Sequence, residues 1–174
     1  MAPAGSYLDK GVGKKCPKGT YTDGLNTKAV CDACANGVTT AGEGSTSVAA
    51  CDRAIKGYKY TGANTADKCD LHTYSDAENT AASCTPCPFG WKTQADGADG
   101  LALCLAPPGY EQAAVNATIT ECAEGSYKEG WNRNPCVACG TNVVTNSTGS
   151  VSKDACLVPP GYGLTTLSPM IAQP

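Results

Sequence analysis

Twelve cysteines recur at nearly fixed spacing, and this repeat constrains the fold of the 174-residue chain more than any other feature. The interval from Cys16 to Cys69 and the interval from Cys69 to Cys122 are both 53 residues. Each copy reads C-x14-C-x2-C-x16-C, except that the first gap of the third copy is one residue shorter. Self-similarity at one period predicts tandem copies of a single unit. The cysteines are Cys16, Cys31, Cys34, Cys51, Cys69, Cys84, Cys87, Cys104, Cys122, Cys136, Cys139 and Cys156.

Other residue types keep the same register. A tyrosine stands five places after each opening cysteine, a threonine eleven places before each closing cysteine, and a glycine seven places before it. Gly or Asn stands three places after each C-x2-C, and because these residues adopt left-handed backbone angles most readily, the position predicts a turn with positive φ. The repeated residues are Tyr21, Tyr74, Tyr127, Thr40, Thr93, Thr145, Gly44, Gly97, Gly149, Gly37, Gly90 and Asn142.

The composition predicts that disulfides stabilise each copy. Aromatic residues make up only 6% of the chain, whereas it holds 20 Gly, 11 Pro and 12 Cys. A unit this poor in large apolar side chains cannot offset its chain entropy by burial alone. Two disulfides per copy, each closing a loop of roughly 15 to 20 residues, would contribute about 3 kcal/mol apiece.

We therefore predict a small disulfide-rich fold, mostly irregular with short β-strands, in three tandem modules of about 53 residues that form an elongated rod. Strands are expected around each repeated tyrosine and around each repeated threonine, separated by Gly-containing turns. The repeated tyrosine is expected to lie against a disulfide.

The predicted division of the chain follows the cysteine period. Residues 1–15 resemble the exit segment of a preceding repeat, because Ala2 to Tyr7 is similar to the Pro-Pro-Gly-Tyr run that follows the later copies. Modules are expected at 16–68, 69–121 and 122–162, followed by a tail or linker at 163–174. A fragment of a longer array explains these ends most simply. A sharper alternative is that the head and the tail meet across two molecules, head to tail.

Disulfides persist outside the reducing cytosol, so the chain is expected to be extracellular or at the cell surface. Asn116 and Asn146 each begin an Asn-x-Thr acceptor sequence for N-linked sugar, and the many Ser and Thr residues permit O-linked sugar. No stretch approaches the apolar length of a membrane span.

The order of motifs within a copy resembles the cysteine-rich, EGF-like modules of ephrin-receptor type. These motifs are the run C-x-x-G-x-Y, the C-x2-C, Thr and Gly before a closing cysteine, and a Gly-Tyr pair after it. Tumour necrosis factor receptor modules and cysteine-repeat surface proteins of ciliates and algae are similar. The resemblance spans Cys16 to Tyr162. It implies a first-to-third and second-to-fourth pairing, which joins Cys16 to Cys34 and Cys31 to Cys51 and repeats in the later copies. Spacing alone admits three pairings.

Other chemistries for these motifs are weaker. Zinc ribbons pair two C-x2-C motifs about 15 to 20 residues apart, whereas these lie more than 50 apart, so the remaining zinc alternative is a four-thiolate site within one copy. A redox C-x2-C requires a strand-to-helix setting and a single active copy. Asp96 to Gly100 lacks the alternating acids of a calcium loop and is interpreted as a solvated turn. We predict no metal and no cofactor.

An enzyme is not predicted, because the single histidine, His72, stands at a turn position where the other copies have Gly. With 13 basic and 16 acidic residues, a net charge of −3 and no basic stripe, nucleic acid is not an expected partner. Trp91 and Trp131 have no repeat equivalents, so they either fill local cores or mark a contact surface.

Two function classes remain. The first is a non-enzymatic structural protein, a glycosylated repeat rod that self-associates head to tail into a fibre, appendage or surface coat. The second is a ligand-binding ectodomain or surface antigen. The near-equality of the copies favours the first, because a dedicated binding site usually makes one module differ from the others.

Overall fold

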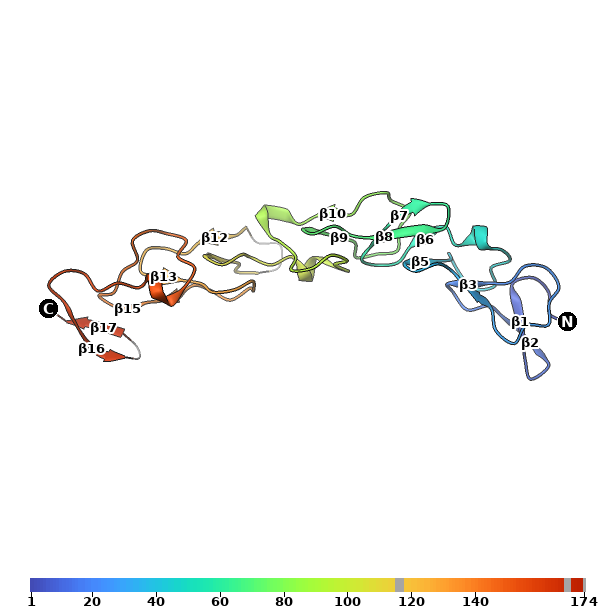
Figure 1. Ribbon diagram of the computed structural model, residues 1–174, viewed down its shortest axis with the longest axis horizontal. Helices are drawn as coiled ribbons and strands as arrows, with labels where there is room; N and C mark the ends of the chain where they lie inside the picture. The colour runs from blue at the N-terminus through green and yellow to red at the C-terminus, as the bar shows by residue number, and fades with distance from the viewer. Residues whose placement is uncertain (115–117, 168–169, 174) are drawn as a thin grey trace. The chain divides into compact units, whose positions relative to one another are not determined.

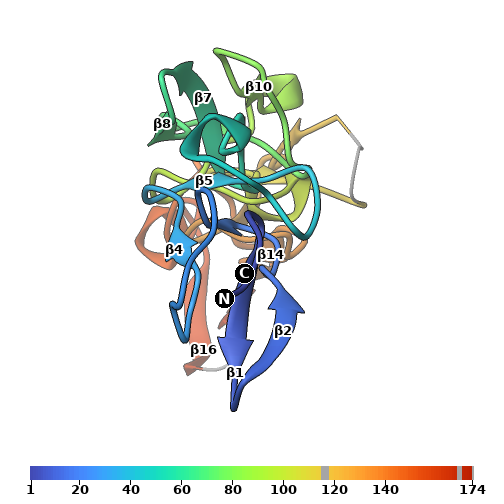
Figure 2. The ribbon, with the colours of Figure 1, turned by 90° about the vertical axis from the view of Figure 1, so that its right-hand side faces the viewer.

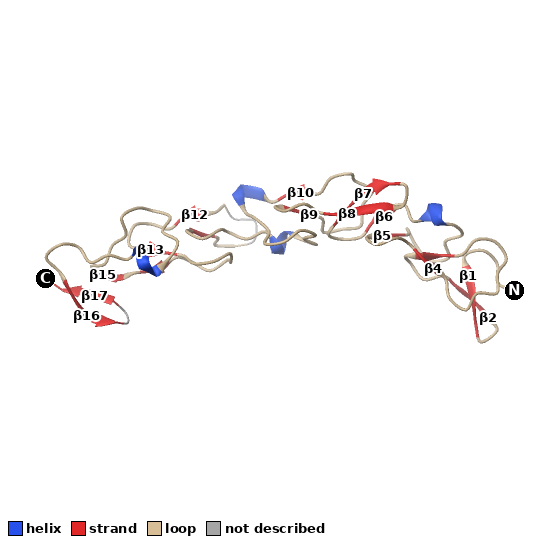
Figure 3. Cartoon of the chain, viewed as in Figure 1, coloured by secondary structure: helices blue, strands red, loops and turns tan. Residues whose placement is uncertain are grey.

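The computed structural model describes residues 1–114, 118–167 and 170–173 (Figure 1). Within them the chain consists of short strands and single-turn 3-10 helices joined by loops and turns, as Figure 3 shows. The predicted small, disulfide-rich fold with short strands is confirmed. The 3-10 helices are η1 (Val48–Ala50), η2 (Pro88–Gly90), η3 (Leu101–Leu103) and η4 (Lys153–Ala155).

The strands form antiparallel pairs, apart from one three-stranded sheet. The pairs are β1 (Ser6–Asp9) with β2 (Val12–Lys15), β3 (Thr20–Tyr21) with β4 (Asp32–Ala33), β5 (Val38–Thr39) with β6 (Arg53–Ala54), β7 (Tyr58–Gly62) with β8 (Thr65–Lys68), β9 (Thr73–Tyr74) with β10 (Thr85–Pro86), β11 (Tyr110–Glu111) with β12 (Thr120–Glu121), and β13 (Ser126–Tyr127) with β14 (Val137–Ala138). The three-stranded sheet has the order β15 (Gly140–Thr141), β17 (Met170–Gln173), β16 (Gly163–Leu167), with β15 and β17 parallel.

The strands predicted at the repeated tyrosines are present as β3, β9 and β13, and the strand predicted before Thr40 is present as β5. At the same place in the later copies, Lys92 and Val144 each form a single antiparallel bridge. Four hairpins that were not predicted from the sequence follow Gly5, Gly57, Gly109 and Gly161. They are β1–β2, β7–β8, β11–β12 and β16–β17, of which the first two are also visible in Figure 2.

The chain divides into two compact units. One consists of residues 1–86 with 95–103, and the other of residues 87–94 with 104–174. The division passes through the second copy, because its Cys69–Cys84 disulfide lies in the first unit and its Cys87–Cys104 disulfide lies in the second.

Each copy has a small core built around its disulfides. The opening cysteines Cys16, Cys69 and Cys122 are fully buried, as are the closing cysteines Cys51 and Cys104. The repeated threonines are buried beside them, whereas large apolar side chains are few in this core. Covalent bonds and buried hydroxyls therefore take the place that a large apolar core has in a globular domain.

The predicted disulfide pairing is wrong. The structure joins the first cysteine of each copy to the second and the third to the fourth. In the first copy the β3–β4 pair brings Cys34 opposite Gly19, whose carbonyl accepts the Cys34 N–H at 2.9 Å. The same register carries Cys31 toward Thr22, and Thr22 Oγ1 lies 3.6 Å from Cys16 Sγ. The hairpin register therefore brings Cys31, and not Cys34, to Cys16.

No helix among the described residues is long and apolar enough to cross a membrane.

Candidate functional site, the junction between modules

The segment after a closing cysteine bonds both backward and forward, and this makes it the junction between two copies. After Cys51, Arg53 and Ala54 form β6 and pair with Thr39 and Val38 of the same copy. Ala54 also exchanges backbone hydrogen bonds with Asn79 of the following copy, at 2.7 and 3.1 Å. Ala54 is fully buried between these partners, so two copies share one residue at their junction.

The same connection recurs after the second copy. Leu105 bonds backward to Lys92, with both N···O distances 2.9 Å, and Ala106 forms an antiparallel bridge forward to Asn132. Ala2, at the start of the chain, forms the bond to the following copy in the same way, because it exchanges backbone hydrogen bonds with Asn26 at 2.8 and 2.9 Å. Residues 1–15 are therefore bonded to the first copy.

The asparagines of this junction form a further repeat that was not predicted from the sequence. Asn26, Asn79 and Asn132 are spaced by 53 residues, the same period as the opening cysteines. Each side-chain oxygen accepts the backbone N–H two residues further along, from Lys28, Ala81 and Asn134, at 3.1, 3.0 and 2.9 Å. This local Asx bond fixes the loop that receives the junction strand. The 53-residue spacing was the signal that would have found it.

A contact between two glycines closes each copy. The N–H of Gly5 donates to Thr22 O, its carbonyl accepts the Cys16 N–H, and the Cys16 carbonyl accepts the Gly44 N–H. A Cβ at Gly5 would lie 2.2 Å from Gly44 O; at Gly57 it would lie 2.6 Å from Gly97 O, and at Gly109 2.3 Å from Gly149 O. The repeated Gly44, Gly97 and Gly149 are thus one half of a close backbone approach, and the glycine before each hairpin is the other.

The turn with positive φ predicted after each C-x2-C is confirmed, with φ of 77° at Gly37, 75° at Gly90 and 58° at Asn142. Gly37 must be glycine for a second reason, because the ring of Tyr58 occupies the space of a side chain. A Cβ at Gly37 would lie 2.4 Å from Tyr58 Cδ1. Tyr58 begins the hairpin of the next copy, so its ring packs on the turn of the preceding one. At the corresponding place, Ile119 Cδ1 lies 3.6 Å from the Cβ position of Gly90.

One ion pair also joins the first two copies. Lys18 Nζ lies 2.6 Å from Glu78 Oε2, with both side chains partly exposed. A pair exposed to this degree contributes at most about 1 kcal/mol, so backbone bonds and ring packing dominate the junction.

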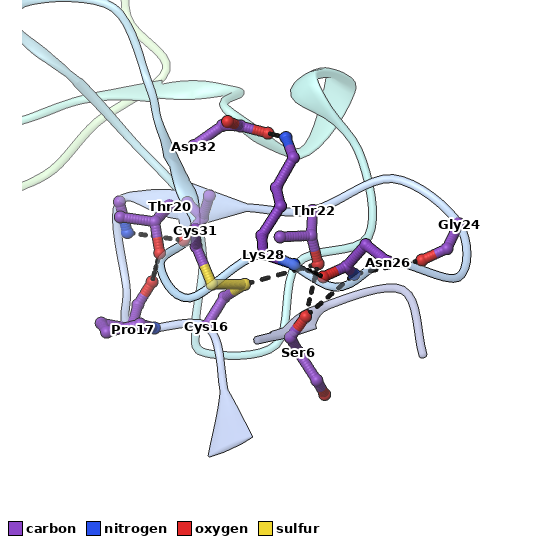
Figure 4. The surroundings of a disulfide bond; sticks show 12 residues. Ser6, Cys16, Pro17, Thr20, Thr22, Gly24, Asn26, Lys28, Cys31 and Asp32 are labelled. Carbon is purple, nitrogen blue, oxygen red and sulfur yellow. Dashed lines mark hydrogen bonds and ion pairs between the residues drawn. A yellow bond between two sulfur atoms is a disulfide. The ribbon is translucent and has the colours of Figure 1, made fainter. Parts of the chain in front are cut away.

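Buried hydroxyls organise the inside of each copy. Thr40 Oγ1 accepts the Gly19 N–H at 2.9 Å and donates to Gly42 O, and Thr145 Oγ1 accepts the Gly125 N–H at 3.0 Å. Thr93 is buried at the same position. Figure 4 shows the next layer, in which the Thr22 hydroxyl and the Asn26 amide both donate to Ser6 O beside the Cys16–Cys31 disulfide.

The repeated tyrosines lie beside this layer. Tyr21, Tyr74 and Tyr127 each form a parallel bridge to the segment after the repeated glycine, and Tyr127 packs against the buried pair Cys139 and Val143. His72, which replaces a glycine, has a φ of 70° and keeps the left-handed turn of Gly19 and Gly125.

The residue after the tyrosine differs in the third copy. It is Thr22 in the first copy, Ser75 in the second and Lys128 in the third. The Lys128 side chain is buried, and its ammonium donates to the carbonyls of Ala106, Pro107 and Gly130 at 3.1 to 3.2 Å. Burial lowers the pKa of Lys128 below 10.5.

Asn146 is exposed, whereas Asn116 lies outside the described residues. Thr148 of the Asn146 acceptor sequence donates its hydroxyl to Glu121 Oε2 at 3.0 Å, and Tyr110 donates to Glu121 Oε1 at 2.7 Å. The Tyr110 hydroxyl and then the Thr148 hydroxyl lower the pKa of Glu121 below 4.5. The exposed carboxylate thus ties the hairpin to the acceptor loop.

The two tryptophans are not equivalent. Trp91 is 1% exposed and fills the local core, while Trp131 is partly exposed and has the Lys92 ammonium 5.8 Å above its ring. Asp96 of the predicted turn lies 3.6 Å from Lys68. No group of three His, Cys, Asp or Glu side chains within the described ranges is placed to hold a metal ion.

The comparisons agree with this construction. A family model described as tyrosine-protein kinase ephrin type A/B receptor-like matches residues 5–51 and 109–156, which together are more than half of the chain. Each match begins at the glycine of the close backbone approach and ends at a closing cysteine. A comparison with curated proteins found no match.

Proposed function

Because the chain belongs to the ephrin type A/B receptor-like family of cysteine-rich modules, a non-catalytic and extracellular type, we propose that it is a structural repeat protein of the cell exterior. In this proposal its modules form a glycosylated rod that self-associates head to tail into a fibre or surface coat. The observation that carries it is the junction, where one buried residue bonds to two successive copies.

The tail carries the elements that begin a module. The junction alanines Ala2, Ala54 and Ala106 each stand three residues before the glycine of the close approach, and Val158 stands three residues before Gly161. A hairpin, β16–β17, then follows, as it does after Gly5, Gly57 and Gly109. The tail of one molecule therefore has the chemistry to take the place of residues 2–15 on the first module of another.

The exchange predicts a new glycine contact. In the isolated chain a Cβ at Gly161 would meet no atom of the described residues within 4 Å. In the exchanged assembly Gly161 would take the place of Gly5, whose Cβ position is 2.2 Å from Gly44 O. The variant Gly161→Ala incurs the modest cost of a left-handed φ of 89°, so it should leave the monomer folded, but it should block assembly. Gly163→Ala, also in open space, should leave both folding and assembly unchanged.

The test is sedimentation velocity with electron microscopy of the non-reduced protein over a concentration series. Filaments or larger species from the wild type and from Gly163→Ala, and monomers from Gly161→Ala, would support the exchange. A wild-type protein that stays monomeric at all concentrations would refute the fibre. Assembly that is equal in all three proteins would refute the exchanged junction.

Sugar is part of the proposal. Asn146 is exposed on a loop of the third copy, which supports modification there. Mass spectrometry of the secreted protein before and after enzymatic removal of N-linked glycans tests both acceptor sites. The ligand-binding alternative is favoured by one observation, a hollow in the third copy that has polar side chains in its lining.

A further inference from the structure

The third copy has a hollow of about 320 Å³ whose lining combines charged, polar and apolar residues. This volume lies at the lower end of the range for small-molecule sites. The lining residues are Glu111, Gln112, Ala113, Arg133 and Pro135.

The repeat shows which of these residues the fold itself does not need. The position of Gln112, three residues after the hairpin glycine, holds Leu8 in the first copy and Tyr60 in the second. The position of Arg133, one residue after the repeated asparagine, holds threonine in both other copies, at Thr27 and Thr80. The position of Glu111 holds Tyr7 and Lys59. The other copies form the same strand pairs with different residues at these positions. The fold therefore does not require this set of polar residues, which is specific to the third copy.

Gln112 is a poor choice for stability alone. Its side chain is 2% exposed, and its Nε2 donates to Ala114 O at 3.2 Å. Its Oε1 is buried and has no hydrogen-bond partner among the described residues. A buried acceptor without a donor costs about 1 to 3 kcal/mol. Because the other copies place apolar or aromatic side chains at this position, the unused acceptor indicates a donor that arrives with a ligand.

The flanking charges are held by the backbone. Glu111 Oε2 accepts the Cys136 N–H at 2.9 Å, and Arg133 Nη2 donates to Cys104 O at 3.5 Å. One carboxylate and one guanidinium of opposite sign give the hollow no net charge. A charged ligand would therefore gain little over a neutral one, whereas a neutral ligand with several donors and acceptors would match all three polar side chains.

We propose that this hollow binds a neutral saccharide. Neighbouring hydroxyls of a sugar both donate and accept, so one can donate to Glu111 while another accepts from Arg133. Gln112 lines the hollow, and a turn of its amide toward the ligand would bring the buried Oε1 to a sugar hydroxyl. Ala113 and Pro135 supply apolar contact for the C–H face of the ring. The inference does not depend on head-to-tail assembly. The sugar comes either from solution or a partner, or from the N-linked glycan of the chain itself at Asn116, three residues after Ala113.

The experiment uses saturation-transfer NMR on the full chain with glucose, galactose, mannose and N-acetylglucosamine as methyl glycosides. We expect binding of at least one glycoside and at least a tenfold weaker affinity in Gln112→Leu and in Arg133→Thr, which restore residues of the other copies and should keep the fold. Thr27→Arg places a guanidinium at the exposed equivalent position of the first copy and should leave binding unchanged.

Asn116→Gln separates the two sources. If wild-type and Asn116→Gln chains bind equally, the site serves an external sugar; if only Asn116→Gln binds, the chain's own glycan occupies it. Absence of saturation transfer from either protein to any of the four glycosides would overturn the proposal. Unchanged binding in folded Gln112→Leu would also overturn it, since the orphan acceptor would then have no part in recognition.

Discussion

The close approach of Gly5 to Gly44 yields the most direct test of the module architecture. Replacing Gly5 by Ala places a Cβ 2.2 Å from Gly44 O at a residue with φ of 76°. Gly11→Ala is the matched control, because Gly11 has a φ of 84° but no atom within 4 Å of its Cβ position. Both variants incur the left-handed cost of an L residue, about 1 kcal/mol, and only Gly5→Ala adds the clash with backbone.

Overpacking against backbone that cannot move away costs about 1 to 3 kcal/mol, so Gly5→Ala should destabilise the first copy by about 2 to 4 kcal/mol. Hydrogen exchange of the Cys16 and Gly44 amides measures this locally, because these two donate in the hydrogen bonds that surround Gly5. At 1.4 kcal/mol per factor of ten, we expect both amides to exchange roughly 30-fold to several-hundred-fold faster in Gly5→Ala. Equal acceleration in Gly5→Ala and Gly11→Ala would refute the argument from the glycine contact.

Four further outcomes are expected. In Lys128→Ser the free energy of unfolding should lack the rise with pH that the wild type shows on approach to 10.5, because the depressed pKa makes the folded state bind fewer protons there than the unfolded state. The wild type should lose free energy of unfolding as the pH falls below 4.5, since the Tyr110 hydroxyl lowers the pKa of Glu121 in the folded state. Glu121→Gln has no carboxyl to protonate, so it should not show this loss. Gly37→Ala should lower the melting temperature of the protein. Adding Tyr58→Ala should remove the part of this loss that comes from the ring clash and leave the part that comes from the positive φ. A non-reducing peptide map should link the first cysteine of every copy to the second.

The sequence predicts the module type because the period fixes which residues are equivalent. The positive φ at Gly37 follows from residue type alone, since Gly and Asn share this position across the copies. The strand at Tyr21 follows from its β-forming neighbours and the turns that flank it. These features are local, so composition and spacing suffice for them.

The disulfide pairing could not be predicted in this way, because it depends on the register of a two-residue strand pair. Tyr21 pairs with Asp32, and this brings Cys31 toward Cys16. Loops of 15 and 17 residues satisfy the spacing as well as the alternatives do. Pairing is decided by hydrogen bonds between segments, and the order of cysteines contains no information about them.

The hairpins were missed for a related reason. The Gly-Tyr pair after each closing cysteine reads as an exit from the copy before it, yet Gly57 bonds to Ser75 and Cys69 of the copy after it. The sequence does not show to which copy this segment belongs, because the junction residue Ala54 bonds both to the preceding copy and to the following one. The spacing of Asn79 by 53 residues from Asn26 and from Asn132 carried the missing information.

The repeat also gives a way to separate stability from recognition within one molecule. Three copies built on the same hydrogen bonds show what the module needs, such as a hydroxyl at Thr40 and Thr145 and a glycine pair at each close approach. A polar group that only one copy buries, at a position where the others place Leu8 or Tyr60, adds nothing to that requirement. The acceptor on Gln112 therefore lowers the stability of the third copy unless a ligand completes it, and a sugar that binds there should raise the melting temperature of the wild type but not of Gln112→Leu.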